Sequence, residues 1–244
     1  MVVFLTCARG WQTLAATRSL GEKGVKVVTA DSVPFATSYH SRYSRGHFRY
    51  DSYTDEEKFI DSLIAGIRSR SSSPDDVLIP VFREGYLISK HLHRFDGLVK
   101  VPITSYSNLQ HVHDKWKLYR LATSMGIRMP KTYRPRSLKE CRELAGNIAF
   151  PALVKVLDAA SGLGIKVVYS ADELVSQYRL ARHDFGEIPL VQEFVHGTDY
   201  CVTVLFNKGR LRASMTYRNI KQFPPKTGIG VVSRTVKEEG MERI

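Results

Sequence analysis

The chain has 244 residues, and its 43% hydrophobic and 25% charged residues are typical of a globular protein, which excludes disordered, collagen-like and low-complexity chains. Lysine and arginine outnumber aspartate and glutamate by 36 to 24, so the net charge of +12 favours anionic partners such as phosphates, nucleic acid or acidic lipid, among which composition does not choose. No apolar run approaches the ~20 residues of a membrane span. The apolar run at the N-terminus is too short for a signal peptide, so we expect no membrane association.

Three cysteines are widely spaced along the chain, at Cys7, Cys141 and Cys201. An odd number of distant cysteines is typical of reduced, packed side chains and not of a disulfide framework. Because thiols stay reduced inside the cell, the sequence predicts a cytoplasmic protein.

The first half of the chain alternates strand and helix signals. Residues 2–6 form a continuous apolar run, which is typical of a strand buried on both faces of a parallel sheet. A helical pattern follows over residues 14–20, and residues 25–29 predict a second strand that Asp31 closes. Together these elements have the size of a βαβ unit, which takes about thirty residues.

A second unit of this kind begins at a capping box, with Thr54 as the N-cap and Glu57 three residues later. Apolar residues then mark one helical face over residues 59–67. A serine-rich loop follows, and residues 77–81 predict another strand. Strands that alternate with helices predict an α/β fold with a doubly wound parallel sheet in this half of the chain.

A dinucleotide-binding turn would need the pattern G-x-G-x-x-G between the first strand and the first helix. This chain has one glycine there, Gly10. Asp31 after the second strand could bind a ribose or cap a loop, and we favour the cap. A nicotinamide or flavin enzyme is therefore not expected, although another anionic ligand could bind at the carboxyl ends of these strands.

Two histidine pairs and one basic stretch each allow a functional and a structural interpretation. His91 and His93, like His111 and His113, are two residues apart, and such residues face apart on a helix and cannot chelate one metal ion. We expect capping or solvated histidines in the first pair and leave the role of the second open. Residues 41–50 mix arginine with aromatic residues and could bind single-stranded nucleic acid, but we favour a loop that enters a strand, with phosphate-binding or solvated arginines.

In the second half of the chain a lysine, Lys155, lies within the apolar strand predicted at residues 150–156. A loop of small residues at 158–164 leads into a strand at 165–169, and a helix begins at Ser170. The loop lacks the P-loop pattern, so we expect a hairpin between antiparallel strands. Its backbone N–H groups could approach phosphate oxygens while the lysine supplies a positive charge. A hairpin turn beside a surface lysine is the structural alternative.

The segment 189–195 has apolar residues on both sides of a Gln-Glu pair. Backbone groups of such a segment can bind the edge of an adenine, with Glu193 accepting a hydrogen bond from the exocyclic amine. Asp199, after the turn that follows, could hold ribose hydroxyls. Residues 207–209 then predict a hairpin turn into another strand.

Four motifs occur in a fixed order in this half: Asp114-Lys115, Pro151-Ala152-Leu153-Val154-Lys155, Ser161-Gly162-Leu163-Gly164, and Val191-Gln192-Glu193-Phe194-Val195-x-Gly197-x-Asp199-Tyr200. Together they resemble the ATP-grasp superfamily, and most closely its carbamoyl-phosphate-synthase-like carboxylate–amine ligases. The resemblance implies a pre-ATP-grasp Rossmann-like domain at 1–113 and a partial ATP-grasp domain of α+β type, without its last strands, at 114–244. Within the latter, a lid subdomain would span about 131–188 and the C-terminal subdomain would start at 189–244.

The resemblance also implies roles for individual residues. It assigns ATP binding to Lys115, Lys155, Ser161, Gly162, Gly164, Gln192, Glu193, Val195 and Asp199. The lysines would contact the phosphates, the second one also near the adenine, and the serine and glycines would lie in a lid loop. Glu193 and the backbone at Val195 would hold the adenine, and Asp199 the ribose. Arg218 and Lys221 would be the catalytic residues on the phosphate and acceptor side.

The reaction that the resemblance implies is ligation driven by ATP. A carboxylate attacks the γ-phosphate of Mg·ATP, and an amine then displaces phosphate from the acylphosphate. ATP-grasp enzymes usually hold Mg²⁺ with a late acid and a Glu-x-Asn motif, and no Glu-x-Asn follows Gly230. We therefore expect a truncated ligase with its metal ligands in a missing C-terminal segment.

The expected partners are ATP, a small carboxylate and an amine, and a homodimer is possible. Two other functions stay open. The first is a non-catalytic nucleotide-binding module. The second, ranked last because no known nucleic-acid-binding motif occurs, is a nucleic-acid binder.

Overall fold

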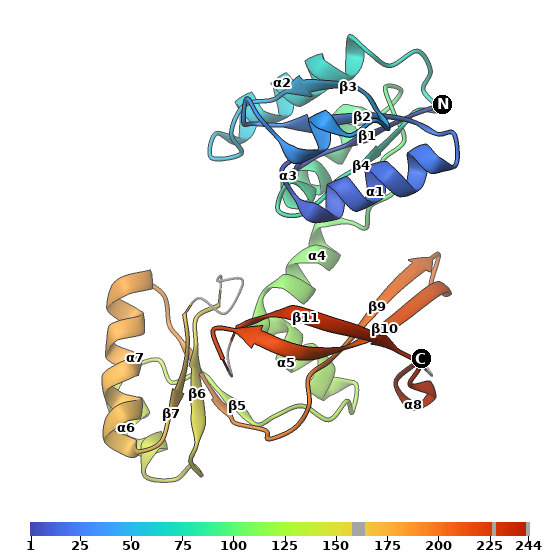
Figure 1. Cartoon of the computed structure of the whole chain (residues 1–244). Coiled ribbons are helices and arrows are strands. Elements are labelled where there is room, and N and C mark those ends of the chain that lie inside the picture. Colours follow the sequence, from blue (N-terminus) through green and yellow to red (C-terminus); the bar gives the residue numbers. More distant parts are fainter. Residues whose placement is uncertain (158–163, 226–227, 243–244) are drawn as a thin grey trace. The chain divides into compact units, whose positions relative to one another are not determined.

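The structure is a computed structural model that describes residues 1–157, 164–225 and 228–242 (Figure 1). The chain forms two compact units, Met1–Gln110 and His111–Ile244. The first unit contains β1 (Val2–Leu5), α1 (Trp11–Glu22), β2 (Lys26–Asp31), η1 (Thr37–His40), β3 (Ser44–Arg49), α2 (Glu56–Arg68), β4 (Val77–Ile79), α3 (Glu84–Lys90) and η2 (Leu92–Phe95). The boundary between the units falls within α4 (Tyr106–His113).

The sheet of the first unit is parallel, with the strand order β3-β2-β1-β4. Side chains alternate between its two faces, and both faces are covered. On one face Val3 and Leu5 pack with Leu20 of α1, and on the other face Phe4 packs with Phe59 of α2 and with Ile88 of α3. The predicted doubly wound parallel sheet is confirmed.

The second unit contains α5 (Lys115–Ser124), β5 (Thr132–Tyr133), α6 (Leu138–Ala145), β6 (Ala152–Lys155), β7 (Ile165–Val168), α7 (Ala171–Phe185), β8 (Leu190–Glu193), β9 (Tyr200–Asn207), β10 (Arg210–Phe223), β11 (Ile229–Val236) and α8 (Glu239–Glu242). Its two sheets are antiparallel, with the orders β5-β8-β6-β7 and β11-β10-β9. Helices α6 and α7 bury one face of the four-stranded sheet around Tyr178 and Val191. This mixed arrangement confirms the predicted α+β class of the second unit.

Helix starts show how local chemistry sets the elements. Ser170 caps α7, the helix predicted to begin there, and Ser137 caps α6. Each serine accepts a hydrogen bond from the backbone N–H three residues on, at 3.1 Å for Ser137 and 3.2 Å for Ser170. The N-cap of α2 lies one residue after Thr54, the cap that the capping-box spacing predicts. Asp55, and not Thr54, accepts from the backbone N–H of Lys58, at 3.3 Å. Both residue types cap helices well, so the spacing alone does not separate them.

The histidines and cysteines in the described residues make the contacts of capping and packed side chains. His91 caps the C-terminus of α3 and its Nε2 contacts Glu56, as the capping interpretation predicted. Throughout the described ranges, no three His, Cys, Asp or Glu side chains gather closely enough to hold a metal ion. All three cysteines are free thiols, and Cys7 and Cys141 are buried. Every helix in the described residues is too short or too polar to span a bilayer.

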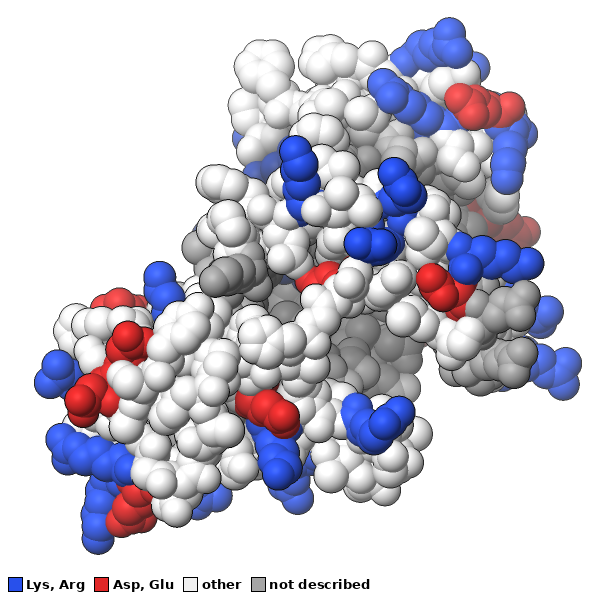
Figure 2. Space-filling view, turned by 60° about the horizontal axis from the view of Figure 1, so that its bottom comes forward, with Lys and Arg blue, Asp and Glu red and all other residues white. Residues whose placement is uncertain are grey.

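The basic stretch around β3 has internal partners. The Arg42 guanidinium lies over the Tyr43 ring, 4.8 Å from its centroid, and donates to the Tyr43 hydroxyl. Tyr39 stacks on His47 with their ring centroids 4.3 Å apart. Figure 2 shows lysine and arginine side chains scattered over the visible face, with uncharged surface between them. Residues 44–49 of the stretch form β3, so the loop that the sequence favoured is confined to the residues before this strand.

Candidate functional site

A cavity of about 810 Å³ lies in the second unit. Strands β6 and β7 contribute to its lining from the four-stranded sheet, and β10 contributes from the three-stranded sheet. The segment that joins β8 to β9 closes a further side. Lys155, Asp199 and Arg218 are its charged lining residues among those that the structure describes.

The alternation of strand β6 determines why a lysine faces this cavity. Ala152 and Val154 point into the core under α6 and α7, so Leu153 and Lys155 point to the opposite face and line the cavity. Ile165, which is paired with Lys155 across β6 and β7, lines the same cavity. The ammonium group of Lys155 is therefore carried on a wall of the cavity that is otherwise apolar, formed by Leu153 and Ile165.

The charge of Lys155 is held by polar partners but is poorly hydrated. Its Nζ donates to Gln192 Oε1 at 2.5 Å, and Gln192 Nε2 donates to Thr132 Oγ1 at 2.7 Å. Burial lowers the pKa of Lys155, the nearby positive charge of Lys115 lowers it further, and Asp199 opposes the shift. Two partly buried cations near a cavity favour an anionic ligand, because such a ligand offsets their desolvation and mutual repulsion.

Lys115 is the first residue of α5, and Asp114 caps that helix by accepting from the backbone N–H groups of Trp116 and Lys117. Lys115 Nζ donates to the carbonyl oxygen of Leu157, whose own N–H donates to Glu187 at 2.6 Å. Two charged side chains therefore fix the backbone at the end of β6. Ser161 and Gly162, the predicted lid residues that follow, lie outside the described residues.

Gly164 resumes the chain before β7 and has a φ of +70°, a backbone conformation that favours glycine. Its carbonyl oxygen accepts from the N–H of Val156 at 3.1 Å. A Cβ atom at this position would lie 2.2 Å from Val156 Cγ2. The close approach of β6 and β7 at this end of the hairpin therefore requires glycine.

We expect Gly164→Ala to lower the free energy of unfolding of the second unit by about 2–4 kcal/mol, because the new methyl group combines backbone strain with a clash. The matched control is Gly186→Ala at the end of α7. Gly186 has a similar φ of +66°, but a Cβ atom there meets nothing within 4 Å. Urea unfolding should therefore show a smaller loss for the control, and equal losses would contradict a steric role for Val156.

A further wall of the cavity is formed by the segment after β8. Phe194 and His196 make an edge-to-face pair with ring centroids 4.8 Å apart, and both line the cavity. The backbone carbonyl of Asp199 accepts from the N–H of Asn219 at 2.9 Å, and its carboxylate accepts from Gln222 Nε2. These bonds attach the segment to β10, so the acid is held in place although it is exposed.

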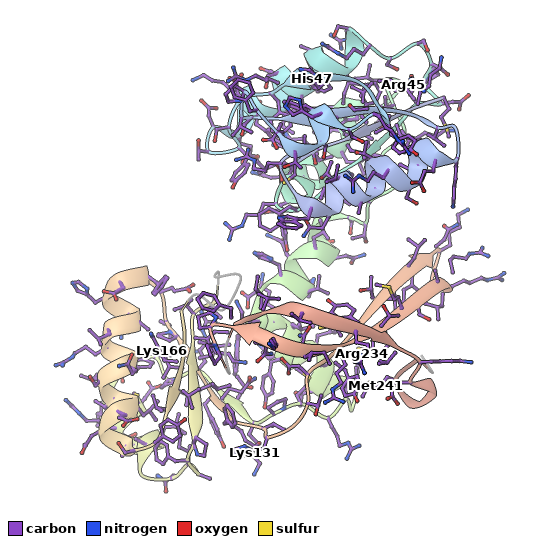
Figure 3. The ribbon with its side chains drawn as sticks, viewed as in Figure 1. Arg45, His47, Lys131, Lys166, Arg234 and Met241 are labelled. Atoms are coloured by element: carbon purple, nitrogen blue, oxygen red, sulfur yellow. The ribbon has the colours of Figure 1, made fainter. Side chains whose placement is uncertain are left out.

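The predicted site residues are only partly brought together. Val195, Asp199 and Arg218 line the cavity with Lys155, and Gln192 lies behind the lysine as its hydrogen-bond partner. Three others do not line it. The carboxylate of Glu193 accepts from the backbone N–H of Lys131 at 3.2 Å, Lys221 is exposed on β10, and Lys115 contacts the backbone of Leu157. Lys131 is labelled in Figure 3.

Sequence reasoning missed several residues of this site. The Phe194–His196 pair, Asn219 and Gln222 were not singled out, and neither was Glu187 behind the loop. Strand alternation within the predicted segments could have suggested the aromatic pair, which is spaced by two residues. The polar pair on β10 could not be found this way, because the pairing of that strand shifts register after Asn219.

Magnesium is a poor match for the described residues. Mg²⁺ needs several oxygen ligands in octahedral geometry. Of the described residues that line the cavity, Asp199 alone is acidic, and its carboxylate already accepts from Gln222. These residues therefore do not form a magnesium site by themselves.

Comparison with known proteins shows what this chain is similar to. Residues 112–232 match the family described as ATP-grasp domain. The chain is 33% identical over 107 residues to the carbamoyl phosphate synthase large chain of Sulfolobus acidocaldarius, a match that covers 44% of this chain and 10% of that protein. It is 29% identical over 92 residues to the D-alanine–D-alanine ligase of Pseudomonas putida, which covers 38% of this chain and 29% of the ligase.

Solved structures share the fold at low sequence identity. The L-amino acid ligase from Bacillus licheniformis superposes with a TM-score of 0.73 at 13% identity, over 99% of this chain and 56% of that one. Biotin carboxylase from Campylobacter jejuni in complex with β-γ-ATP gives a TM-score of 0.70 at 16% identity, over 90% and 51%. The chain therefore spans about half the length of these structures, and a smaller part of the two relatives above.

Proposed function

Because the chain belongs to the ATP-grasp superfamily, we propose that the cavity of its second unit binds ATP and serves an ATP-dependent ligation of a carboxylate to an amine. The observation that carries the proposal is Lys155. It is a partly buried cation of lowered pKa on the apolar wall of a cavity, with a second cation near it. Phosphates supply the negative charge that this arrangement lacks.

Each residue has a proposed part in nucleotide binding. Lys155 and Lys115 hold the phosphates, and Asp199 holds the ribose. The adenine lies against the segment after β8, where the backbone at Val195 can form hydrogen bonds and Gln192 orients the lysine. We assign Gly164, together with Ser161 and Gly162, to the lid loop. We also propose that the domain boundary lies after residue 113.

The position of Glu193 in the structure favours a role other than adenine binding. Adjacent residues of a strand face opposite sides, so Gln192 and Glu193 cannot both turn their side chains toward the cavity. Because the Glu193 carboxylate holds the backbone of Lys131, we assign it the positioning of β8 beside β5. Contact with an adenine would then come from backbone atoms after β8.

The proposed reaction needs no nucleophile from the protein. An acceptor carboxylate oxygen bonds to the γ-phosphorus, ADP leaves, and an amine nitrogen then attacks the acyl carbon and expels phosphate. The protein contributes orientation and positive charge, for which Arg218 and Lys221 on β10 are the candidates on the acceptor side. Because the described residues do not form a magnesium site, we assign no step to a metal ion.

The test of nucleotide binding is thermal unfolding of the full chain with ATP or ADP, each with and without Mg²⁺. A ligand present at 100 times its dissociation constant stabilises the folded state by about 2.7 kcal/mol, which raises the unfolding temperature measurably. The absence of any shift at millimolar nucleotide, with circular dichroism showing a folded protein, would contradict the proposal.

Nucleotide affinity should fall as the pH rises through the lowered pKa of Lys155. Below that pKa the lysine is charged and binds phosphate, and above it the lysine is neutral in the free protein, so binding must take up a proton. Isothermal titration at a series of pH values below the ordinary lysine pKa of about 10.4 measures the trend. In Lys155→Met this part of the pH dependence should disappear, and an unchanged profile in that variant would contradict the assignment.

A non-catalytic nucleotide-binding module is the second candidate, and the poor fit for magnesium favours it. Both candidates predict nucleotide binding. They differ in ADP release, which only the ligase shows when a carboxylate and an amine are supplied together.

A further inference from the structure

A second cavity, of about 410 Å³, lies between α6 and α7, the helices that cover the four-stranded sheet of the second unit. Figure 1 shows these helices side by side. They run in opposite directions, because the end of α7 contacts the chain just before α6. There the Tyr178 hydroxyl donates to the carbonyl oxygen of Pro135, and Arg182 Nη1 donates to that of Arg136 at 3.2 Å. Residues three or four apart on each helix line the cavity, as expected for two rows of side chains that face each other.

Two arginines line this cavity, one from each helix. Arg142 lies on α6 and Arg179 on α7, and both side chains are exposed. Within the part of the chain that the structure describes, neither guanidinium forms a hydrogen bond or an ion pair. Arg94 of the first unit differs, because it contacts the carboxylates of both Glu57 and Asp61. Two arginines without carboxylate partners suit an oxyanion, because each planar guanidinium offers parallel N–H donors to its oxygens.

The acids of the two helices explain why the arginines are left without partners. Glu140 and Glu173 each accept a hydrogen bond from a backbone N–H at 2.8 Å, and Glu143 pairs at 4.0 Å with a lysine of its own helix. Asp172 does line the cavity, but it lies seven residues before Arg179, which is about 10 Å along the axis of α7. It belongs to the first turn of α7, where a carboxylate stabilises the helix. The Arg179 end of the cavity is therefore its positive end.

Apolar side chains and a hydroxyl complete the cavity. Leu138 of α6 and Val175 of α7 are half-buried, and both pack against the core beneath the helices. Both also line the cavity, so they form its apolar base. Ser176, beside the valine, adds a hydroxyl donor. Small-molecule sites typically combine apolar walls with a few polar groups that orient the ligand, as this cavity does.

We propose that this cavity binds a small phosphate monoester that carries an aromatic or branched alkyl group. The phosphate accepts hydrogen bonds from the guanidinium groups of Arg142 and Arg179 and from the Ser176 hydroxyl. The apolar group lies on Leu138 and Val175. Phosphate is favoured over a carboxylate, because its three terminal oxygens can accept from both guanidinium groups at once.

The proposed site is separate from the nucleotide cavity. Strand β6 turns Val154 toward α6 and α7 and turns Lys155 toward the nucleotide cavity, so the two sites lie on opposite faces of one sheet. A ligand between α6 and α7 would join the two helices without touching ATP. The site uses only these helices and does not depend on nucleotide binding.

The test is calorimetric titration of the full chain with phenyl phosphate in a buffer without phosphate or nucleotide. Inorganic phosphate lacks the apolar group, and benzyl alcohol lacks the charge. We expect phenyl phosphate to bind at least about tenfold more tightly than either, because it alone uses both the arginines and the apolar base. No binding of phenyl phosphate at about 10 mM, or equal binding of either of the other two probes, would overturn the proposal.

Arg142→Gln and Arg179→Gln should each weaken phenyl phosphate binding at least about tenfold, because each removes one charged donor. Both side chains are exposed and glutamine is a good helix former, so both variants should fold. The matched control is Arg212→Gln on β10, which removes an exposed arginine outside the cavity and should bind as the unaltered chain does. Retained affinity in either cavity variant, or an equal loss in the control, would contradict the proposal.

Lys155→Met distinguishes this site from the nucleotide cavity. Phenyl phosphate should bind this variant as tightly as the unaltered chain, because Lys155 lies on the other face of the sheet. A loss of binding in Lys155→Met would place the probe in the nucleotide cavity, and the proposed site between the helices would be wrong.

Discussion

Replacing Lys155 with methionine should weaken ATP and ADP binding roughly 10- to 100-fold, the value of a charged hydrogen bond in a poorly hydrated site. Methionine keeps the length of the side chain and removes the charge. The fold should tolerate it, because a buried charge that raises the energy of the free protein is lost with it, although Gln192 Oε1 then loses its donor. Isothermal titration gives the affinity, and thermal unfolding without nucleotide gives the stability.

The control for this variant is Lys166→Met on the neighbouring strand β7. Lys166 is exposed, does not line the cavity and is labelled in Figure 3. The Lys166→Met substitution removes the same charge from the chain as Lys155→Met does, so it accounts for any general effect of net charge on nucleotide binding. Similar affinity losses in both variants would show that Lys155 acts only through the overall charge of the protein, and the proposed phosphate contact would be wrong.

Replacing Gly66 with alanine should destabilise the first unit by about 1–3 kcal/mol, even though alanine is a better helix former than glycine. Gly66 lies in α2, and a Cβ atom there would meet Phe48 Cδ2 at 2.1 Å. The ring has little freedom to move, because it packs edge-on against Phe4 and carries the Arg70 guanidinium on its face. Urea unfolding followed by hydrogen exchange of the α2 and β3 peptides measures the loss.

Gly46→Ala is the matched control, since Gly46 lies on β3 itself and a Cβ atom there meets nothing within 4 Å. This substitution should leave the stability unchanged or raise it by up to about 1 kcal/mol, because alanine loses less backbone freedom on folding. The two variants are therefore expected to differ in sign. A stable Gly66→Ala protein would mean that α2 can move away from β3.

Local signals predicted most of the elements but not every boundary. The hairpin of β6 and β7 followed from an apolar strand, a run of small residues and a second strand. Ser170 marked the start of α7, where it accepts a hydrogen bond from the backbone N–H three residues on. The N-cap of α2 is Asp55 and not Thr54, and because both residue types cap helices well, residue type alone could not decide between them.

The site was harder to predict than the fold, because it depends on which face each strand turns inward. Lys155 could be expected to lie opposite the buried Val154, since both belong to one short strand. The orientation of Glu193 depends on how β8 pairs with β5 and β6, which are distant in sequence. The hydrogen bond from the Tyr50 hydroxyl to Glu84 could not be predicted at all, since the two residues follow β3 and β4, which are the two outer strands of the sheet.

The hydrogen bond from the Cys7 amide to the Tyr50 hydroxyl has a consequence for the dynamics of the first unit. This amide is protected by a side chain and not by a neighbouring strand, so it can exchange with solvent when the tyrosine rotates away, without unfolding of the sheet. The amide of Ala8, one residue on, donates to the backbone carbonyl of Ala30 and should exchange more slowly. The ratio of the two exchange rates would then report how often the Tyr50 side chain moves away from the end of β1.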